Sequence, residues 1–196
     1  MIEVKRADEL GDSIRKDMSR IFTEGFYQWL KFFTKDKKKL SRAFTHMFQL
    51  DVFYVALVNN KVAGIASCTD NSNQSVSISR KEFIRHLGLV RGMIAAAILK
   101  GEFENHPYPF EMGDHTGSIE FVASSPKCRG KGVASAIISH IKNTQKYEDY
   151  VLEVADTNTA AVNLYEKSGF KEFTRVPQKH PKQSGVNYLI YMKCKE

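Results

Sequence analysis

Residues 118–134, SIEFVASSPKCRGKGVA, hold the pattern that decides the fold. The first seven residues are typical of a buried strand, which runs directly into a turn that contains Gly130 and Gly132. The stretch 132–145, GVASAIISHIKNTQ, then has the apolar spacing of an amphipathic helix. The sequence therefore predicts a strand, a glycine-rich turn and a helix in direct succession.

This turn is suited to holding an anion. Gly130 and Gly132 lack side chains, so backbone N–H groups there can approach a bulky anion closely. The helix that follows adds unpaired N–H donors and the positive end of its dipole. A pyrophosphate fits this combination, although Arg-Gly-Lys-Gly taken alone can equally be an exposed basic turn. The spacing is neither that of a P-loop nor that of a dinucleotide-binding fingerprint, which needs a third glycine.

Strand and helix patterns alternate on both sides of this stretch. Asn59 and Asn60 join two apolar runs and favour a hairpin, since asparagine tolerates a positive φ. Ser79 and Gly101 are expected to begin and end one long helix. We expect strands at 2–5, 51–60, 61–70, 118–124, 149–156, 170–177 and 186–194, helices at 8–33, 36–48, 79–101, 132–145 and 158–169, and loops at 70–75 and 104–117. This order predicts a mixed α/β sheet in a single domain over 1–196.

The composition is that of an ordinary globular protein, with 42% hydrophobic and 26% charged residues in 196. No apolar run is long enough to span a membrane, and the N-terminus lacks the apolar core of a secretory signal. Cys68, Cys128 and Cys194 lie far apart, which favours reduced thiols and a cytoplasmic location. No metal is expected, because metal-ligand spacing is absent from the cysteines and from the histidines at 46, 86, 106, 115, 140 and 180.

The net charge of +7 favours contact with anions without naming them. The basic run 35–39 is typical of a solvated helix start or loop. No interleaved aromatic and basic stripe supports nucleic-acid binding, so nucleic acid is not an expected partner. Attraction of a polyanionic cofactor is enough to explain the excess of basic residues.

Two motifs carry a resemblance to a known family. Arg129 through Ala134 resembles the Arg/Gln-x-x-Gly-x-Gly/Ala motif of the GCN5-related N-acetyltransferases (GNAT), in which a proline such as Pro126 is also usual. Downstream, Leu-Glu-Val at 152–154 and the pattern Asn-x-x-Ala-x-x-Leu-Tyr-Glu-Lys-x-Gly-Phe at 158–170 are similar to its next strand and helix. The resemblance covers about 118–175. It implies the GNAT fold: an α/β (α+β) arrangement with a mixed, mostly antiparallel sheet, splayed central strands and flanking helices.

The resemblance also implies where acetyl-CoA binds. The backbone of the first splayed strand would pair with the pantetheine arm, and here that strand includes Val122, Ala123 and Ser124. The pyrophosphate would be held by N–H groups of Gly130, Lys131, Gly132, Val133, Ala134 and Ser135. Arg129 and Lys131 either add charge there or lie solvated at the rim. Asn158 either binds the pantetheine or caps its helix.

The same resemblance assigns the chemistry to three side chains. Tyr165 would protonate the departing thiolate, unless it is an ordinary core residue. Glu120 is the first candidate for the general base, and Glu153 on the neighbouring strand is the second. Either carboxylate could instead pair with a nearby Lys or Arg. A backbone N–H near Val122 would polarise the thioester carbonyl, and Cys128 is expected to be a turn residue.

These expectations lead to one function and two alternatives. The chain is expected to be an N-acyltransferase that moves an acetyl group from acetyl-CoA to an amine of a small molecule or peptide, by direct attack. A non-catalytic acyl-CoA-binding module would use the same turn without the chemistry. A basic nucleic-acid-binding protein would leave the strand–turn–helix motif unexplained. The acceptor and the oligomeric state, which includes a homodimer as an option, are open.

Overall fold

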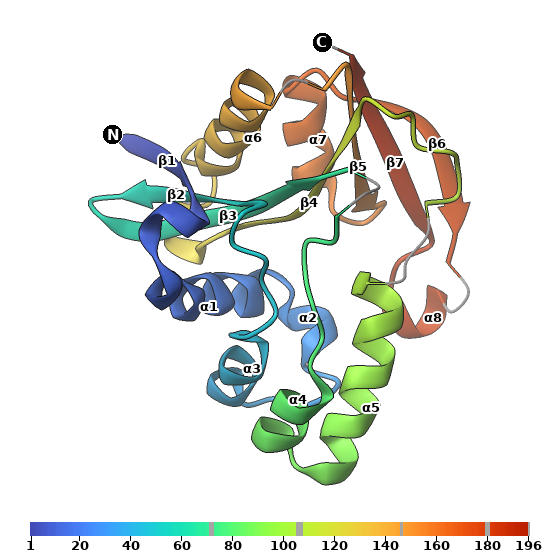
Figure 1. Ribbon diagram of the computed structural model, residues 1–196. Coiled ribbons are helices and arrows are strands. Elements are labelled where there is room, and N and C mark those ends of the chain that lie inside the picture. The colour runs from blue at the N-terminus through green and yellow to red at the C-terminus, as the bar shows by residue number, and fades with distance from the viewer. Residues whose placement is uncertain (71–72, 105–107, 146, 179–180, 196) are drawn as a thin grey trace.

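The computed structural model describes residues 1–70, 73–104, 108–145, 147–178 and 181–195. Its centre is a seven-stranded sheet in the order β1-β2-β3-β4-β5-β7-β6 (Figure 1). The strands are β1 (Ile2–Arg6), β2 (Phe53–Val58), β3 (Lys61–Thr69), β4 (Thr116–Ser124), β5 (Asp149–Ala155), β6 (Lys171–Pro177) and β7 (Tyr188–Lys195). β4 and β5 run parallel, and every other neighbouring pair runs antiparallel. The predicted mixed, mostly antiparallel sheet is confirmed.

Helices cover both faces of this sheet (Figure 1). On one face α1 (Arg15–Gly25) packs against β3 and β4, and beyond it follow α3 (Lys37–Phe44), α4 (Arg80–Leu87) and α5 (Leu89–Leu99). On the other face lie α6 (Val133–Thr144) and α7 (Thr159–Lys167). Shorter helical turns are η1 (Ala7–Leu10), η2 (Asp12–Ile14), α2 (Tyr27–Leu30), η3 (Lys100–Glu104), η4 (Pro126–Cys128) and α8 (Pro181–Ser184).

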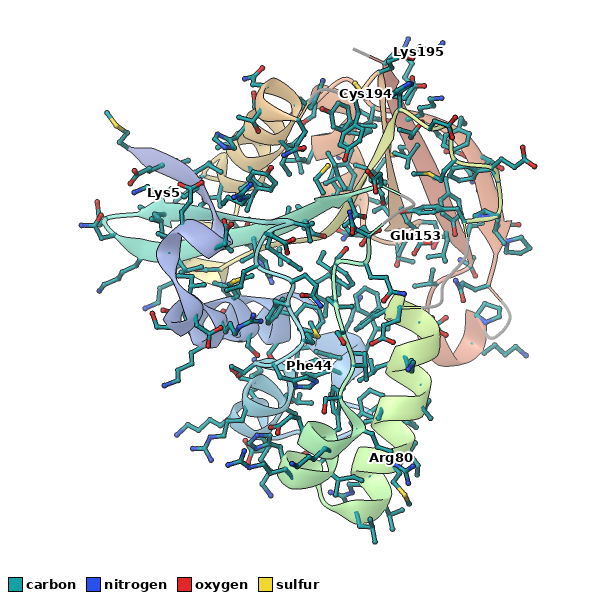
Figure 2. All side chains as sticks on the ribbon, viewed as in Figure 1. Lys5, Phe44, Arg80, Glu153, Cys194 and Lys195 are labelled. Carbon is teal, nitrogen blue, oxygen red and sulfur yellow. The ribbon has the colours of Figure 1, made fainter. Side chains whose placement is uncertain are left out.

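Each face has its own apolar core. The α1–α5 face buries a cluster rich in phenylalanine, in which the rings of Phe22 and Phe44 lie 5.1 Å apart. Figure 2 labels Phe44 among these helices. The α6–α7 face buries Ile137, Leu152 and Phe170 among others. Full burial of one such side chain contributes roughly 1.5–3 kcal/mol, so both faces are firmly fixed to the sheet.

The hairpin predicted at Asn59 and Asn60 is confirmed. Their φ angles are 51° and 59°, and Val58 pairs directly with Lys61 across the turn. Two consecutive left-handed residues form the two-residue turn whose twist matches that of the flanking strands. Asparagine is among the few residues that adopt this conformation at low cost.

The single helix predicted over 79–101 is wrong, because the segment forms two helices. Ser79 caps α4 as expected, because its hydroxyl accepts the N–H of Glu82 at 3.4 Å. Gly88, with φ of 85°, ends α4 and lets α5 begin in a new direction. A Cβ at Gly92 would lie 2.5 Å from the backbone of Ile84, so this glycine permits the two helices to touch. Gly101 does not stop the helix, since a π-helical turn continues to Glu104.

The predicted helices at 8–33 and 36–48 are shorter than expected. Two 3₁₀ turns occupy 7–14, and α1 begins only at Arg15. Phe26, with φ of −104° and ψ of 11°, separates α1 from the single turn α2. Asp36 caps α3 by accepting the N–H groups of Lys38 and Lys39 at 2.9 and 3.1 Å. The other expected strands and helices lie within two or three residues of their predicted bounds. The predicted loops at 70–75 and 104–117 fall partly outside the described residues.

Among the residues that the structure describes, none of the helices combines the length and the apolar composition needed to cross a bilayer.

Candidate active site

The parallel strands β4 and β5 separate part of the way along their length. They pair at Thr116 with Asp149, at Gly117 with Tyr150 and at Ser118 with Val151, and within the described residues their ladder ends there. Beyond Ser118, β4 stays paired to β3, and beyond Val151, β5 stays paired to β7. The sheet therefore opens into a fork, as the splayed central strands of the expected fold require.

Two glutamates stand at the mouth of this fork. Glu120 and Glu153 each follow the last paired residue of their strand by two positions, so they share one face of the sheet. Their neighbours Ile119 and Leu152 point into the α6–α7 core, which places both carboxylates on the opposite face, toward α1–α5. Figure 2 shows Glu153 on the side of the sheet that faces α5. The structure thus brings together the two residues that the sequence proposed as alternative bases.

A β-bulge distorts β4 beside the fork. Ile65 pairs with Ala123 and Ser67 with Glu120, so two residues of β4, Phe121 and Val122, lie opposite one residue of β3. Phe121 has φ of 53°, a left-handed conformation that a bulky residue rarely adopts. Such a residue costs on the order of 1–3 kcal/mol and is held only where its surroundings compel it. The bulge redirects the backbone at 121–122, next to the predicted thioester position, and sequence reasoning did not find it.

Contacts of the Phe121 ring offset the cost of its left-handed backbone conformation. The ring packs at 5.2 Å from Phe103, 5.9 Å from Phe22 and 6.2 Å from Phe53, measured between ring centroids. Aromatic pairs at such separations contribute roughly 0.5–1.5 kcal/mol each beyond their buried area. The aromatic core on the α1–α5 face therefore holds the bulge in place.

Hydroxyl groups surround the carboxylate of Glu120. Ser118 Oγ donates to its Oε1 at 2.9 Å, and Thr69 Oγ1 does so at 3.4 Å. Ser75 Oγ donates to Oε2 in a short contact, and the hydroxyl of Tyr108 lies 3.5 Å from Oε1. No lysine or arginine in the described part of the chain forms an ion pair with Glu120, so the alternative of a simple structural salt bridge is not what the structure shows.

Two tyrosines link the glutamates across the fork. The hydroxyl of Tyr108 also contacts Ser118 Oγ closely, and its ring lies 6.1 Å from that of Tyr191. Tyr191 stands opposite Glu153 in the β5–β7 ladder and donates its hydroxyl to that carboxylate. Burial is the main cause that raises the pKa of Tyr108, and the negative charge of Glu120 adds to it. Burial is also the main cause that raises the pKa of Tyr191, and its hydrogen bond with Glu153 adds to it. Both phenols therefore keep their protons at neutral pH.

Sequence reasoning missed these tyrosines. Tyr108 lies in a segment that the family motifs do not cover, and its partners are ten or more residues away along the chain. Tyr191 lies 38 positions after Glu153, and only the register of β5 with β7 brings them together. No local pattern in the sequence signals either contact.

The turn after β4 is open and lacks a cap. Gly130 and Gly132 have φ of 71° and 78°, and a Cβ on either would meet nothing within 4 Å. Glycine is needed there for the backbone conformation, while the space above the turn stays free. α6 begins at Val133 without a side-chain cap, whereas Asp36, Ser79 and Asn158 cap α3, α4 and α7.

The uncapped end of α6 fits a pyrophosphate. The first backbone bond of this helix joins the N–H of Ala136 to the carbonyl of Gly132. N–H groups in the preceding turn of a helix have no intrahelical acceptor and favour a bound anion. Arg129 and Lys131 beside the turn are exposed, and Cys128 is a half-buried free thiol in the 3₁₀ turn.

Asn158 and Tyr165 lie on α7. Asn158 caps this helix, since its side chain accepts the N–H of Ala161 at 3.3 Å. Tyr165 is only 6% exposed and packs within the α6–α7 core, 6.2 Å from the ring of Phe170. Its hydroxyl forms no hydrogen bond with any residue that the structure describes, and burial raises its pKa. A buried, protonated phenol without a hydrogen-bond partner among the described residues is compatible both with a general acid and with a core residue.

No group of three or more His, Cys, Asp or Glu side chains is placed to hold a metal ion within the described residues, which leave out His106 and His180.

Residues 15–170 match the sequence model of the Acetyltransferase (GNAT) family. The match covers most of the chain, and the chain therefore belongs to the GNAT acetyltransferases, enzymes that use acetyl-CoA as the acetyl donor. The resemblance carried by the glycine turn and the α7 motif is confirmed, together with the fold that it implied.

Solved structures share this fold at low sequence identity. PH1933 from Pyrococcus horikoshii OT3 is 20% identical with a TM-score of 0.58, covering 100% of this chain and 99% of its own. An N-acetyltransferase from Staphylococcus aureus Mu50 is 18% identical with a TM-score of 0.60, covering 97% and 99%. The ribosomal-protein-S18-alanine N-acetyltransferase from Escherichia coli is 16% identical with a TM-score of 0.57, covering 100% and 94%. No curated protein shows a significant match.

Proposed function

We propose that this protein transfers the acetyl group of acetyl-CoA to an amine by direct attack at the β4–β5 fork, with Glu120 as the general base. The observation that carries the proposal is the carboxylate of Glu120, held at the fork by hydroxyl donors and by no cation among the described residues. A carboxylate without a cationic partner is free to accept a proton from a bound ammonium group. The proposal takes 1–196 as one domain that acts in the cytoplasm without a metal ion.

Backbone groups would bind the donor. The edge of β4 at Val122, Ala123 and Ser124 has no ladder partner on the β5 side within the described residues, so it is free to pair with an extended amide-containing arm. The N–H groups from Gly130 to Ser135 would hold the pyrophosphate, with Arg129 and Lys131 adding charge at the rim. Asn158 caps α7 in the structure, and a contact to the pantetheine arm would use the remaining capacity of its amide.

The proposed reaction moves three protons. Glu120 accepts the first from the bound ammonium group, directly or through the hydroxyl of Ser118 or Tyr108, and the neutral amine then attacks the thioester carbonyl carbon. The nitrogen releases the second proton to solvent once the N–C bond has formed. The C–S bond of the thioester breaks, and Tyr165 gives its proton to the departing sulfur. The redirected backbone near Val122 would donate an N–H to the thioester carbonyl. Acetyl-CoA supplies the acetyl group and the leaving thiol.

Glu153 is the second candidate for the base. Its hydrogen bond from Tyr191 holds it at the other side of the fork, on the face that it shares with Glu120. It is more exposed than Glu120, whose carboxylate is held by several hydroxyl donors. We therefore place Glu120 first and give Glu153 the role of binding or orienting the acceptor.

One observation favours a non-catalytic acyl-CoA-binding module as the alternative. Tyr165, the proposed acid, is packed in the α6–α7 core and could be structural there. A panel of primary amines with acetyl-CoA and detection of free thiol separates the two functions. Release of thiol that depends on an amine, and that is lost in Glu120→Gln, supports acetyl transfer. Tight binding of acetyl-CoA without release under any amine supports the module.

A further inference from the structure

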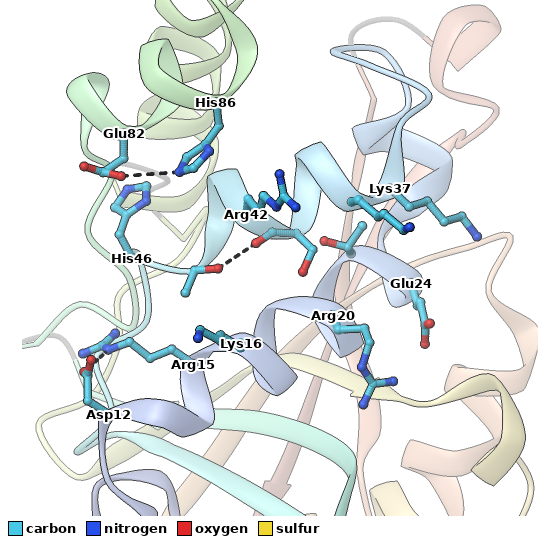
Figure 3. Close-up of a pocket in the computed structure, with 14 residues that line it drawn as sticks. Asp12, Arg15, Lys16, Arg20, Glu24, Lys37, Arg42, His46, Glu82 and His86 are labelled. Carbon is cyan, nitrogen blue, oxygen red and sulfur yellow. Dashed lines mark hydrogen bonds and ion pairs between the residues drawn. The ribbon is translucent and has the colours of Figure 1, made fainter.

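A basic groove lies away from the fork, between α1 and α3. It has a volume of about 960 Å³, and polar or charged side chains from α1, α3 and α4 line it (Figure 3). Among them are Arg15, Lys16, Arg20, Lys37, Lys38 and Arg42, against the carboxylates of Asp12, Glu24 and Glu82. The acetyl-transfer proposal uses none of these residues.

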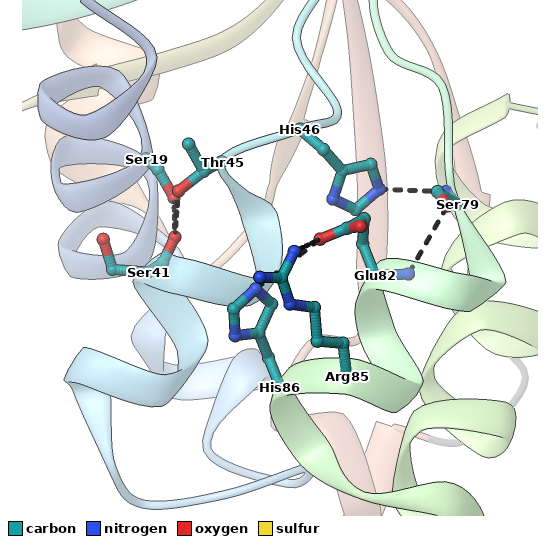
Figure 4. Close-up of polar contacts among 8 residues, drawn as sticks. All are labelled: Ser19, Ser41, Thr45, His46, Ser79, Glu82, Arg85 and His86. Carbon is teal, nitrogen blue, oxygen red and sulfur yellow. Dashed lines mark hydrogen bonds and ion pairs between the residues drawn. The ribbon is translucent and has the colours of Figure 1, made fainter. Parts of the chain in front are cut away.

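Hydrogen bonds hold the walls of this groove in register (Figure 4). Ser19 of α1 and Thr45 after α3 both donate to the carbonyl of Ser41, the second at 2.8 Å. The N–H of Ser79 donates to Nε2 of His46 at 2.9 Å, which joins the end of α3 to the start of α4. These contacts fix three helices relative to one another, so the groove is formed in advance of any ligand.

Three of its cations have no ion-pair partner in the part of the chain that the structure describes: Lys16, Lys38 and Arg42. By contrast, Arg15 pairs with Asp12 at 2.5 Å and Arg20 with Asp17 at 3.3 Å. Lys37 lies over the ring of Tyr27, with its Nζ 4.4 Å from the ring centroid. Positive charge is therefore left over along the groove after its internal pairs are formed.

The floor of the groove holds a buried hydroxyl without a partner. Thr23 is 1% exposed, and its Oγ1 forms no hydrogen bond with any described residue. A buried polar atom left unpaired costs roughly 1–3 kcal/mol, which a ligand that accepts its hydrogen would recover. Thr23 is itself one of the lining residues. This hydroxyl is an observation independent of the charges, and it points to a ligand with acceptor oxygens.

The arrangement of charge selects the kind of anion. Figure 3 shows Asp12 and Glu82 at one end of the groove and Glu24 at the other, with Lys16, Arg20 and Arg42 between them. Carboxylates at both ends would repel a continuous phosphate backbone that runs through the groove. No Phe, Tyr or Trp side chain lines it, so it lacks the large rings on which successive bases stack.

We infer that this groove binds a short acidic segment of a polypeptide. α1 has 11 residues, which at about 1.5 Å each give a length near 16 Å, the span of about five extended residues. Carboxylates of such a segment would pair with Lys16, Lys38 and Arg42, and one would accept the hydroxyl of Thr23. The Glu24 end lies beside the fork, because Gly25 packs on Ala123 of β4. A polypeptide substrate is thereby placed to occupy groove and fork together.

Fluorescence anisotropy with a fluorescein-labelled hexaglutamate peptide and the full chain tests this inference. The assay contains no acetyl-CoA, so its outcome is independent of the proposed acetyl transfer. We expect saturable binding that weakens by about tenfold or more in the double variant Lys38→Glu with Arg42→Glu. Thr23→Val, which keeps the shape and removes the hydroxyl, should weaken binding by about tenfold.

The matched control is the double variant Lys31→Glu with Lys171→Glu, two exposed lysines outside the groove with the same change in charge. It should bind within about twofold of the parent. An equal loss in this control would show a response to net charge and overturn the inference. So would the absence of saturable binding, or tighter binding of a twelve-nucleotide single-stranded RNA through the same groove residues. Thermal unfolding checks each variant, and Lys38→Gln with Arg42→Gln replaces the reversal variant if that one is misfolded.

Discussion

Glu120→Gln replaces the proposed base with an amide of nearly the same size. The carboxylate now accepts two close hydroxyl contacts, from Ser118 at 2.9 Å and from Ser75. A hydrogen bond to a charged acceptor contributes about 1.5–3 kcal/mol and one to a neutral acceptor about 0.5–1.5 kcal/mol. Two weakened bonds therefore lower the free energy of unfolding by about 2 kcal/mol, which a typical domain survives.

The effect on turnover should be larger than the effect on stability. Loss of a general base lowers turnover by about 10²–10⁴, equal to roughly 3–5 kcal/mol in the activation free energy. Glu153→Gln is the control, since it changes the other carboxylate on the same face and should have the smaller effect.

Release of free thiol from saturating acetyl-CoA is the assay, with one amine acceptor and a series of pH values. Glu120→Gln should release thiol about 10²–10⁴ times more slowly than the parent at each pH. Hydroxylamine is a second acceptor that is largely neutral near pH 7, so its rate should depend far less on Glu120. Full rate and an unaltered pH profile in both glutamine variants would refute the reasoning and leave positioning as the main source of catalysis.

Four further predictions concern other parts of the molecule. Gly132→Glu places a negative side chain over the open turn, so calorimetry should show strongly weakened acetyl-CoA binding while the fold survives. Tyr165→Phe should lower turnover by about 10²–10⁴ with acetyl-CoA affinity nearly unchanged. An undiminished rate would show that this tyrosine has only a structural role in the core. Tyr108→Phe keeps the ring contact with Tyr191 but removes the hydroxyl next to Glu120, so turnover should fall about tenfold in steady-state kinetics at an unchanged KM for acetyl-CoA. Burial lowers the pKa of His46, whose Nε2 accepts the Ser79 N–H, so the unfolded chain binds this proton more tightly than the folded chain. The free energy of unfolding should therefore be higher above about pH 6.5 and decrease as the pH falls below it. Urea unfolding of His46→Gln should not show this decrease.

Local patterns accounted for much of the fold. The strand–turn–helix at Gly130 and Gly132, the hairpin at Asn59 and Asn60 and the cap at Ser79 each depend on a few neighbouring residues, and each appears in the structure. The prediction of one long helix over 79–101 was wrong because of Gly88.

Gly88 stands within an apolar periodic stretch, and periodicity alone does not reveal the positive φ that breaks the helix there.

The site was less accessible to sequence reasoning because its contacts are not local. The bulge at Phe121 follows from the register of β4 against β3 and from rings contributed by α1, β2 and η3. Family resemblance supplied Glu120 and Glu153 as separate candidates. Only the ladder of β4 with β5 places them at matching positions of one fork. The tyrosines that join them come from segments without a motif.

The division of the sheet into two faces has a consequence for how such an enzyme could change its substrate. The core on the α6–α7 face supports the pyrophosphate turn and the helix of Tyr165, and it draws mainly on β-strands and on residues after 118. The core on the α1–α5 face is built almost wholly from residues before 104, and the glutamates project toward it. The segments that would bind acetyl-CoA and those that would select the amine thus contact each other mainly through the shared sheet. Replacement of the stretch from α1 to α5 by that of another fold member should alter which amine is accepted while the donor half keeps its affinity, a modular route to new specificity.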